Sequence, residues 1–274
     1  MSVLENIDVS IIIVDYNAGE LLENCVCSLE KNVKCSHEII IVDNCSADKE
    51  VCLLKKLEDK YNSVKIIYNA TNLGFAKANN IAVHIAGGKI YHFLNPDTLV
   101  GDDIDDIYGF VLQDSSLSIY ATTLYESGVQ VNHPQIIETI GCYWKHFFKG
   151  ENFNWYIGAS LIVRKDIFKL IGKWPEDYFM YVEDLDFCYI ACKKGVKIQR
   201  LDCYIEHLGG GTSTKVWSNF DTDVRKEVAL IKFYKKYNFM YNYFIRRTIM
   251  LGKRVFRWHD FVYRFKVILK ALRI

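Results

Sequence analysis

An aspartate directly after a short apolar segment is the first residue in this sequence that could bind a metal. The segment, residues 90–94, ends at Asn95-Pro96, where proline stops a central strand and keeps the preceding residue extended. Asp97 follows in a turn. Carboxylate oxygens suit Mg²⁺ or Mn²⁺, and open α/β sheets place ligands at the carboxyl ends of their strands. An ordinary Asn-Pro-Asp turn without a metal explains the same residues, so the rest of the chain must decide.

Two further aspartates also follow apolar strand segments. Residues 9–14 lead to Asp15, and residues 38–42 lead to Asp43. Because parallel strands end at one edge of a sheet, this convergence favours a nucleotide site. Asp43 could accept a hydrogen bond from N3–H of uracil or thymine, a donor that cytosine lacks. A helix N-cap or an Asx turn is the alternative role for this residue.

A second group of chemically capable residues lies later in the chain. Glu183-Asp184 begins a predicted helix, where the helix dipole alone would explain acidic residues. A carboxylate among aromatic side chains is also how a general base is formed, because partial desolvation raises its pKa. His207 precedes the glycine-rich segment 208–213, whose backbone could approach a phosphate. Imidazole could complete a metal shell that contains a single carboxylate.

Regular alternation of strand and helix patterns positions the first of these residues. Four apolar strand segments alternate with helical patterns over the first hundred residues, which predicts a doubly wound α/β layer. The segments are 9–14, 38–42, 64–68 and 90–94. No G-x-G-x-x-G follows the first strand and no phosphate-loop motif occurs, which disfavours a dinucleotide oxidoreductase or a phosphate-loop ATPase. A helix at 103–113 and strands at 117–124 and 196–205 are also predicted.

The composition is that of a globular protein. Half of the 274 residues are hydrophobic and only 3 are proline, which supplies a large core and excludes a disordered chain. The 9 cysteines form no C-x-x-C pair, so we expect reduced thiols. No apolar run reaches the roughly 20 residues of a membrane span, and no signal peptide is recognisable. These features predict a cytoplasmic protein without a nucleic-acid partner and leave a homodimer open.

Charge divides the chain into an acidic body and a basic tail. Of the 34 basic and 33 acidic residues, 14 and 2 lie from residue 225 onward, so 20 and 31 precede it. Apolar residues recur in the tail at three- and four-residue steps, which predicts an amphipathic helix. They are Trp258, Val262, Phe265, Leu269 and Leu272. An anionic membrane rewards each accompanying cation by about 1 kcal/mol, so residues 237–274 are expected at its surface, with docking on the body as the alternative.

Taken together, these segments resemble the inverting family 2 glycosyltransferases of the GT-A fold, in particular their bacterial rhamnosyltransferase-like branch. The resemblance covers residues 9–213, and its ordered set of motifs is far more specific than any one of them. The motifs are Val14-Asp15-Tyr16-Asn17, Ile41-Val42-Asp43-Asn44, Asn72-Leu73-Gly74-Phe75-Ala76-Lys77-Ala78-Asn79-Asn80, Asn95-Pro96-Asp97-Thr98, Gly158-Ala159, Glu183-Asp184-Leu185-Asp186 and His207.

The resemblance implies a role for each matched residue. Asp43 would hold the base of the donor nucleotide. Asp97 and His207 would bind a divalent metal, Mg²⁺ or Mn²⁺, on the diphosphate. Asp184 would deprotonate the acceptor hydroxyl, with Glu183 as the alternative base. The other donor-binding residues would be Asp15, Tyr16, Asn17, Asn72, Gly74, Lys77, Asn95, Gly158, Gly210 and Thr212. In the family's D-x-D metal motif, Asn95 takes the first position here.

The resemblance also implies the fold and the reaction. A Rossmann-like GT-A domain at residues 1–224 would bind donor in about 1–100 and acceptor in about 101–224, and a basic helical tail would follow at 225–274. L-rhamnose from dTDP-rhamnose, or a hexose from a UDP-sugar, would pass to a lipid-linked glycan in O-antigen or capsule synthesis. The enzyme would be peripheral on the inner face of the cell membrane.

Two other functions are compatible with these features. A sugar nucleotidyltransferase on a similar fold would require a basic, glycine-rich loop after the first strand, where Asp15-Tyr16-Asn17-Ala18 stands. The second alternative is an inactive glycan-binding scaffold at the membrane surface.

Overall fold

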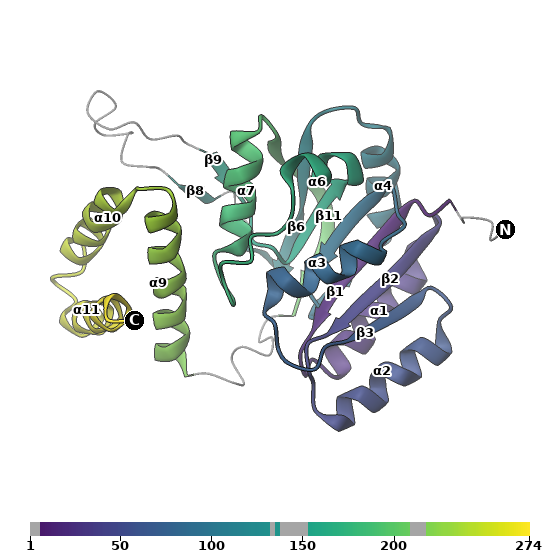
Figure 1. Cartoon of the computed structure of the whole chain (residues 1–274), viewed down its shortest axis with the longest axis horizontal. Helices are drawn as coiled ribbons and strands as arrows, with labels where there is room; N and C mark the ends of the chain where they lie inside the picture. Colours follow the sequence, from purple (N-terminus) through teal and green to yellow (C-terminus); the bar gives the residue numbers. More distant parts are fainter. Residues whose placement is uncertain (1–5, 132–134, 138–152, 209–217) are drawn as a thin grey trace. The chain divides into compact units, whose positions relative to one another are not determined.

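Runs of β-branched residues form the first strands of the central sheet. This computed structural model describes residues 6–131, 135–137, 153–208 and 218–274. The first four strands are β1 (Val9–Asp15), β2 (His37–Asp43), β3 (Val64–Tyr68) and β4 (Ile90–Leu94). They are parallel neighbours in the order β3-β2-β1-β4, and the first three of these are labelled in Figure 1. β1 and β2 are covered at nearly every position, as expected for strands with helices on both faces.

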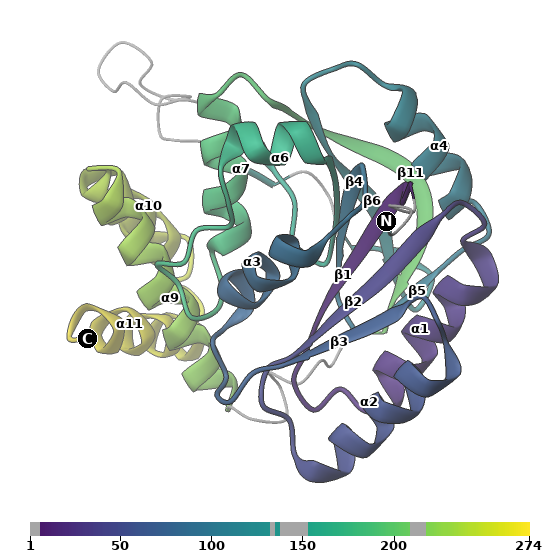
Figure 2. The same cartoon turned by 45° about the vertical axis from the view of Figure 1, so that its right-hand side comes forward.

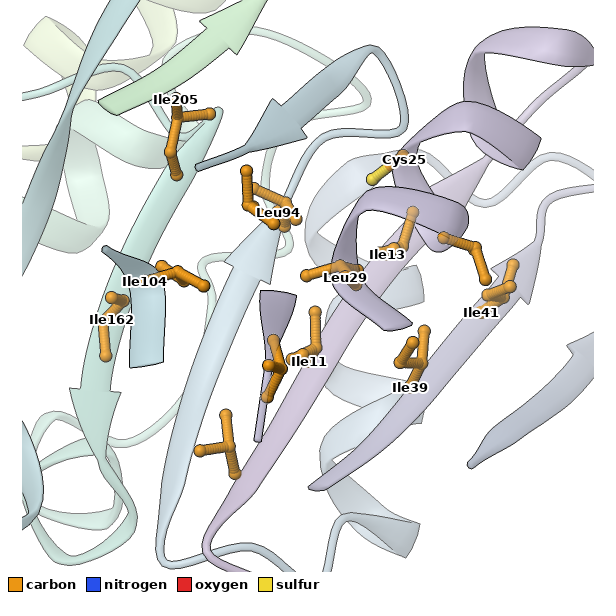
Figure 3. Close-up of a cluster of buried hydrophobic side chains, with 14 of the residues drawn as sticks. Ile11, Ile13, Cys25, Leu29, Ile39, Ile41, Leu94, Ile104, Ile162 and Ile205 are labelled. Carbon is orange, nitrogen blue, oxygen red and sulfur yellow. The ribbon is translucent and has the colours of Figure 1, made fainter. Parts of the chain in front are cut away.

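Two hydrophobic cores, one on each face of the sheet, follow from the alternation of side chains along these strands. Ile11 and Ile13 contribute to one core (Figure 3), and Ile12 contributes to the other. The first core is closed by α1 (Glu20–Asn32), α2 (Asp48–Lys60) and α4 (Ile104–Gln113). The second is closed by α3 (Phe75–Ile85), α6 (Lys165–Ile171) and α7 (Glu183–Lys193). Figure 2 shows α1 and α2 on the face opposite α3.

The sheet continues beyond β4 with strands of mixed direction. They are β5 (Thr98–Val100), β6 (Ser118–Glu126), β7 (Val129–Gln130), β10 (Ser160–Arg164) and β11 (Lys197–His207). β10 runs antiparallel to β4 and β6, and β11 runs parallel to β6 and antiparallel to β5. A separate pair is formed by β8 (Gln135–Ile137) and β9 (Phe153–Trp155). This mixed sheet confirms the predicted α/β fold.

Two strands run further than the sequence predicts, and both extensions shape the site. β6 continues to Glu126, because its last residues pair with β7. β11 continues to His207, because that residue pairs with Thr98 of β5. β11 therefore brings His207 beside Asp97, whereas the predicted strand ended at residue 205.

The chain divides into two compact units. The second unit comprises residues 136–154, 180–182 and 213–274, and the remainder of the chain forms the first. The helices described in the second unit are α9 (Asn219–Lys236), α10 (Met240–Gly252) and α11 (Trp258–Leu272). The boundary predicted at residue 225 falls inside α9. None of the described helices has both the length and the apolar character that crossing a membrane requires.

Candidate functional site

Two aspartates meet at the carboxyl ends of β1 and β2. Asp15 and Asp43 are register partners, and both are buried. Ser46 connects them, because its backbone N–H donates to Asp43 Oδ1 at 3.0 Å and its hydroxyl donates to Asp15 Oδ2 at 3.2 Å. This contact joins Asp43 to a backbone N–H three residues further along, so one carboxylate oxygen stabilises the local turn. Asp43 Oδ2 nevertheless accepts no hydrogen bond from any described residue, so it can accept one from a ligand.

Both carboxylate oxygens of Asp15 accept hydrogen bonds from the protein itself. The Ala18 N–H donates to Oδ1 at 3.1 Å, and Ser46 occupies Oδ2. Burial raises the pKa of Asp15 to about 6, and the nearby charge of Asp43 adds to this effect. Asn17 supports the same loop, since its N–H donates to Ser46 Oγ at 2.8 Å. These contacts make Asp15 and Asn17 organisers of the loop that carries the partly buried Tyr16.

The buried amide of Asn44 holds the segment that precedes α3. Its Nδ2 donates to the Gly74 carbonyl at 3.3 Å, and its Oδ1 accepts from the Leu73 N–H at 3.1 Å. Asn72 Oδ1 accepts from the Gly74 N–H at 3.0 Å. Gly74 has a φ of +81°, and a Cβ at this position would lie 2.1 Å from the carbonyl oxygen of Phe179. The close approach and the left-handed backbone both require glycine here.

Asp97 lies buried just beyond β4 and against the end of β11. His207 Nε2 is 3.4 Å from Asp97 Oδ1, and His207 Nδ1 is 2.8 Å from Glu126 Oε1. The contact with Asp97, reinforced by Glu126, raises the pKa of His207 to about 9. The Leu208 N–H also donates to the Asp97 carbonyl at 2.8 Å. The two predicted metal ligands are therefore neighbours in the structure.

Asp97 and His207 could together hold a cation that is shared with a bound diphosphate, if the cation displaces the proton that the carboxylates keep on His207. Within the described ranges, no three His, Cys, Asp or Glu side chains are grouped as a complete metal site. Mg²⁺ commonly binds only one or two protein carboxylates and completes its shell with phosphate oxygens and water. A carboxylate on the other nitrogen of a ligating histidine fixes the orientation of its ring. Glu126 stands in that position relative to His207.

Asp184 is held in the first turn of α7 by two backbone N–H groups. The Gly158 N–H donates to Oδ2 at 2.9 Å, and the Leu185 N–H donates to Oδ1 at 2.7 Å. Burial raises the pKa of Asp184 to about 6, against the lowering effect of these two hydrogen bonds. A Cβ on Gly158 would lie 3.3 Å from the Cβ of Asp184, so glycine permits this close approach.

The segment Gly158-Ala159 links Asp184 to the end of β4. The Ala159 carbonyl accepts a hydrogen bond from the Asn95 N–H at 2.9 Å. Asn95 lies two residues before Asp97, and Gly158 is bonded to Asp184. The structure thus brings the predicted base and the predicted metal ligand to one edge of the sheet.

The remaining predicted site residues are Lys77, Glu183, Gly210 and Thr212. Lys77 is exposed in the first turn of α3 and forms no ion pair among the described residues. Glu183 is buried at the first position of α7. Gly210 and Thr212 lie outside the described residues.

Sequence reasoning missed Glu126. This residue precedes His207 by 81 positions and belongs to no motif. Only the pairing of β6 with β11 brings their last residues together, with Tyr125 opposite Glu206. The register of two distant strands leaves no local pattern in a single sequence that could have indicated the contact.

Comparisons with known proteins agree with this fold. The family model described as "Glycosyl transferase family 2" matches residues 10–171. Low-salt glycan biosynthesis hexosyltransferase Agl10 of Haloferax volcanii is 26% identical over 207 residues, which cover 70% of this chain and 64% of that protein.

Two solved structures share the fold. The mannosyltransferase PcManGT from Pyrobaculum calidifontis, in complex with GDP-Man and Mn²⁺, has a TM-score of 0.60 at 15% identity, covering 84% of this chain and 64% of the other. S. aureus TarS 1-349 in complex with UDP-GlcNAc has a TM-score of 0.58 at 19% identity, covering 82% and 67%. Among the relatives, this chain spans only 64% of the length of the Haloferax protein. Because the family model covers more than half of its 274 residues, this chain belongs to glycosyl transferase family 2.

Proposed function

We propose that this chain is an inverting glycosyltransferase that uses a nucleoside-diphosphate sugar as its donor. One observation carries the proposal, namely that the segment Gly158-Ala159 is hydrogen-bonded both to Asp184 and to the end of β4. The end of β4 leads directly to Asp97. A group able to accept a proton and a group able to ligate a donor-bound cation therefore share one sheet edge. Family membership supports the same assignment.

The transfer requires a base and a stabilised leaving group. Asp184 takes the proton of the acceptor hydroxyl, whose oxygen bonds to the anomeric carbon as the bond from that carbon to the diphosphate breaks. Attack from the face opposite the diphosphate inverts the configuration. A pKa of about 6 leaves Asp184 ionised at neutral pH and more basic than an ordinary aspartate. A divalent cation, Mg²⁺ or Mn²⁺, held by Asp97 and His207 would stabilise the negative charge on the leaving diphosphate.

The base of the donor is proposed to be uracil or thymine. Asp43 Oδ2 has no hydrogen-bond partner among the described residues and can accept from N3–H of either base. Suitable donors are dTDP-rhamnose and UDP-hexoses. The structure of TarS with UDP-GlcNAc supports a uridine donor, whereas PcManGT was solved with GDP-Man, so the donor must be measured.

The acceptor is proposed to be a hydroxyl of a lipid-linked glycan, as in O-antigen or capsule synthesis. The name of the Haloferax relative refers to glycan biosynthesis, which supports an acceptor of this class. A lipid-linked acceptor is met at a membrane, and we place the protein at the inner face of the cell membrane through its basic tail.

A donor turnover assay tests the proposal against its two alternatives. Purified chain is incubated with dTDP-rhamnose, UDP-glucose and UDP-GlcNAc in Mn²⁺ and in EDTA, and released nucleotides are separated. We expect nucleoside diphosphate from at least one donor in Mn²⁺ and much less in EDTA. In a parallel incubation with a nucleoside triphosphate and a sugar 1-phosphate, release of pyrophosphate would instead identify a nucleotidyltransferase. No turnover of any donor would indicate an inactive scaffold.

A further inference from the structure

The apolar stripe of α11 lies on the side of the helix that faces away from α9. Within the second unit, α11 packs on α9, and its buried residues are Val267, Ile268 and Ala271. The mean direction of the stripe predicted from the sequence differs from that of these buried residues by roughly 130° around the helix axis. Four of its five members are exposed, with fractions of 65% for Trp258, 43% for Phe265, 39% for Leu269 and 43% for Leu272, and the fifth, Val262, is partly buried.

Polar contacts fix this orientation of α11. Tyr263 Oη and Arg264 Nη1 each donate to Asp223 Oδ2 at 3.0 Å. Lys270 Nζ lies 3.2 Å from Asp221 Oδ1. Turning α11 to bury the stripe against α9 would break all three contacts, so the stripe is held outward by its own helix.

Aromatic rings extend the stripe into the turn before α11. Phe256 in this turn is 97% exposed. Trp258 stacks on Phe261 with ring centroids 5.6 Å apart, and Phe261 stacks on Phe265 at 6.1 Å. We call Phe256, Trp258, Phe261, Phe265, Leu269 and Leu272 the outward face. A contiguous exposed apolar surface of this kind marks an interaction site.

The same segment carries more positive charge than it can neutralise. Residues 219–274 contain 14 basic and 4 acidic residues. Every one of these acidic residues already forms an ion pair with a basic residue of α10, of α11 or of the turn between them. They are Asp221, Asp223, Glu227 and Asp260. Residues 219–274 therefore carry a net charge of 14 − 4 = +10.

We propose that the outward face of α11 rests on an anionic lipid bilayer, with its aromatic residues at the level of the headgroups. Arg257, Lys266 and Arg273 lie on the same helix or next to it and form no ion pair in the described part of the chain. Trp and Phe on one face with Arg and Lys around it is the pattern of an interfacial helix. This inference names the surface through which the protein would contact the membrane. It rests on the proposed function only in linking that membrane to a lipid-linked acceptor.

A second copy of this chain suits the outward face less well. A two-fold contact places the same surface patch of both copies together. Arg257, Lys266 and Arg273 of one copy would then approach the equivalent cations of the other, and no spare carboxylate of this segment would separate them. An anionic surface avoids this repulsion.

Vesicle flotation of the full chain tests the inference. The vesicles are phosphatidylcholine alone or phosphatidylcholine with phosphatidylglycerol, at low and high salt. We expect flotation with the anionic vesicles that weakens as salt rises. Brominated lipids should quench the fluorescence of Trp258, and Trp258→Phe should remove the quenched component.

Matched variants assign the binding to the outward face. Lys266→Gln and Arg273→Gln should each lower the partition coefficient about fivefold, the fold-change that corresponds to about 1 kcal/mol per cation. Lys55→Gln and Lys56→Gln, exposed on α2, are the control and should leave it unchanged. Phe265→Ser should lower partitioning about tenfold. Phe110→Ser on α4 removes a similarly exposed Phe and is its control.

Two results would overturn the inference. One is equal flotation of the outward-face variants and their controls. The other is a wild-type chain that self-associates but does not bind vesicles, with the self-association abolished by Phe265→Ser. That result would make the outward face an interface between copies. Donor turnover in solution separates this inference from the proposed function, because a chain that floats but turns over no donor refutes only the latter. A chain that turns over donor without floating refutes only the former.

Discussion

At the scale of single residues, the proposed base is a carboxylate that is desolvated and yet held in place. The Gly158 and Leu185 N–H groups orient Asp184, while burial raises its pKa to about 6. Orientation and basicity thus have separate causes, so they can be tested by separate experiments.

Replacing Asp184 by asparagine tests its role as the base. Asp184→Asn keeps the size and shape of the side chain but cannot accept the proton. Turnover should fall by about 10²–10⁴ while donor affinity stays nearly unchanged. Steady-state kinetics and donor titration measure the two quantities. An active Asp184→Asn together with an inactive Glu183→Gln would assign the base to Glu183 instead.

The pH dependence of turnover tests the raised pKa. Asp184 must be ionised to take a proton, so kcat should decline as the pH falls through about 6 and should be level above it. An unperturbed aspartate would place this decline near pH 4. The residual activity of Asp184→Asn should not show this decline of kcat near pH 6. A wild-type decline near pH 4 would contradict the desolvation that the structure indicates.

Glu126 should act on the metal through His207. Glu126→Gln removes the carboxylate that orients the ring through Nδ1. Affinity for Mn²⁺ should fall about tenfold to a hundredfold, measured from free Mn²⁺ by electron paramagnetic resonance in the presence of UDP. Asp202→Asn, an exposed carboxylate on β11, is the matched control. Equal affinity in the two variants would leave Glu126 without a positioning role.

At the scale of elements, the loop before α3 is built around a residue that must be glycine. Gly74→Ala places a methyl group 2.1 Å from the Phe179 carbonyl in a left-handed backbone. The free energy of unfolding should fall by more than about 1 kcal/mol, measured by urea denaturation. Gly109→Ala on α4 meets open space and should raise it by up to about 1 kcal/mol. A neutral Gly74→Ala would contradict the close packing of this loop.

An element could be predicted when its own residues carried the pattern, and could not when its bounds depended on pairing with a distant segment. Alternating apolar strands and helices predicted the first half of the sheet, because β1, β2 and β4 each carry their own pattern. The extra residues of β6 and β11 could not be predicted, because pairing across distant segments lengthens both strands. Periodicity predicted the stripe on α11 but not its direction, which Asp221 and Asp223 of α9 decide.

At the scale of the whole molecule, the chain combines a sheet unit that carries the site with a basic helical unit. The predicted donor residues Asp15, Asp43 and Asp97 could be assigned to one edge because each ends a strand of the same parallel layer. The acceptor side could not be predicted, since residues 125–153 have weak periodicity and residues 138–152 lie outside the described part. Charge asymmetry predicted a basic helical tail at residues 225–274, but it could not indicate the ion pairs among α9, α10 and α11.

The central claim is that the edge of the sheet at Asp97 binds a nucleoside-diphosphate sugar together with a divalent cation. The most direct measurement is the donor-induced thermal shift in Mn²⁺, compared between the wild type and Asp97→Ala. We expect dTDP-rhamnose or a UDP-hexose to raise the Tm of the wild type, and Asp97→Ala to keep its ligand-free Tm but lose the shift. An equal shift in Asp97→Ala, or no shift with any donor, would contradict the claim.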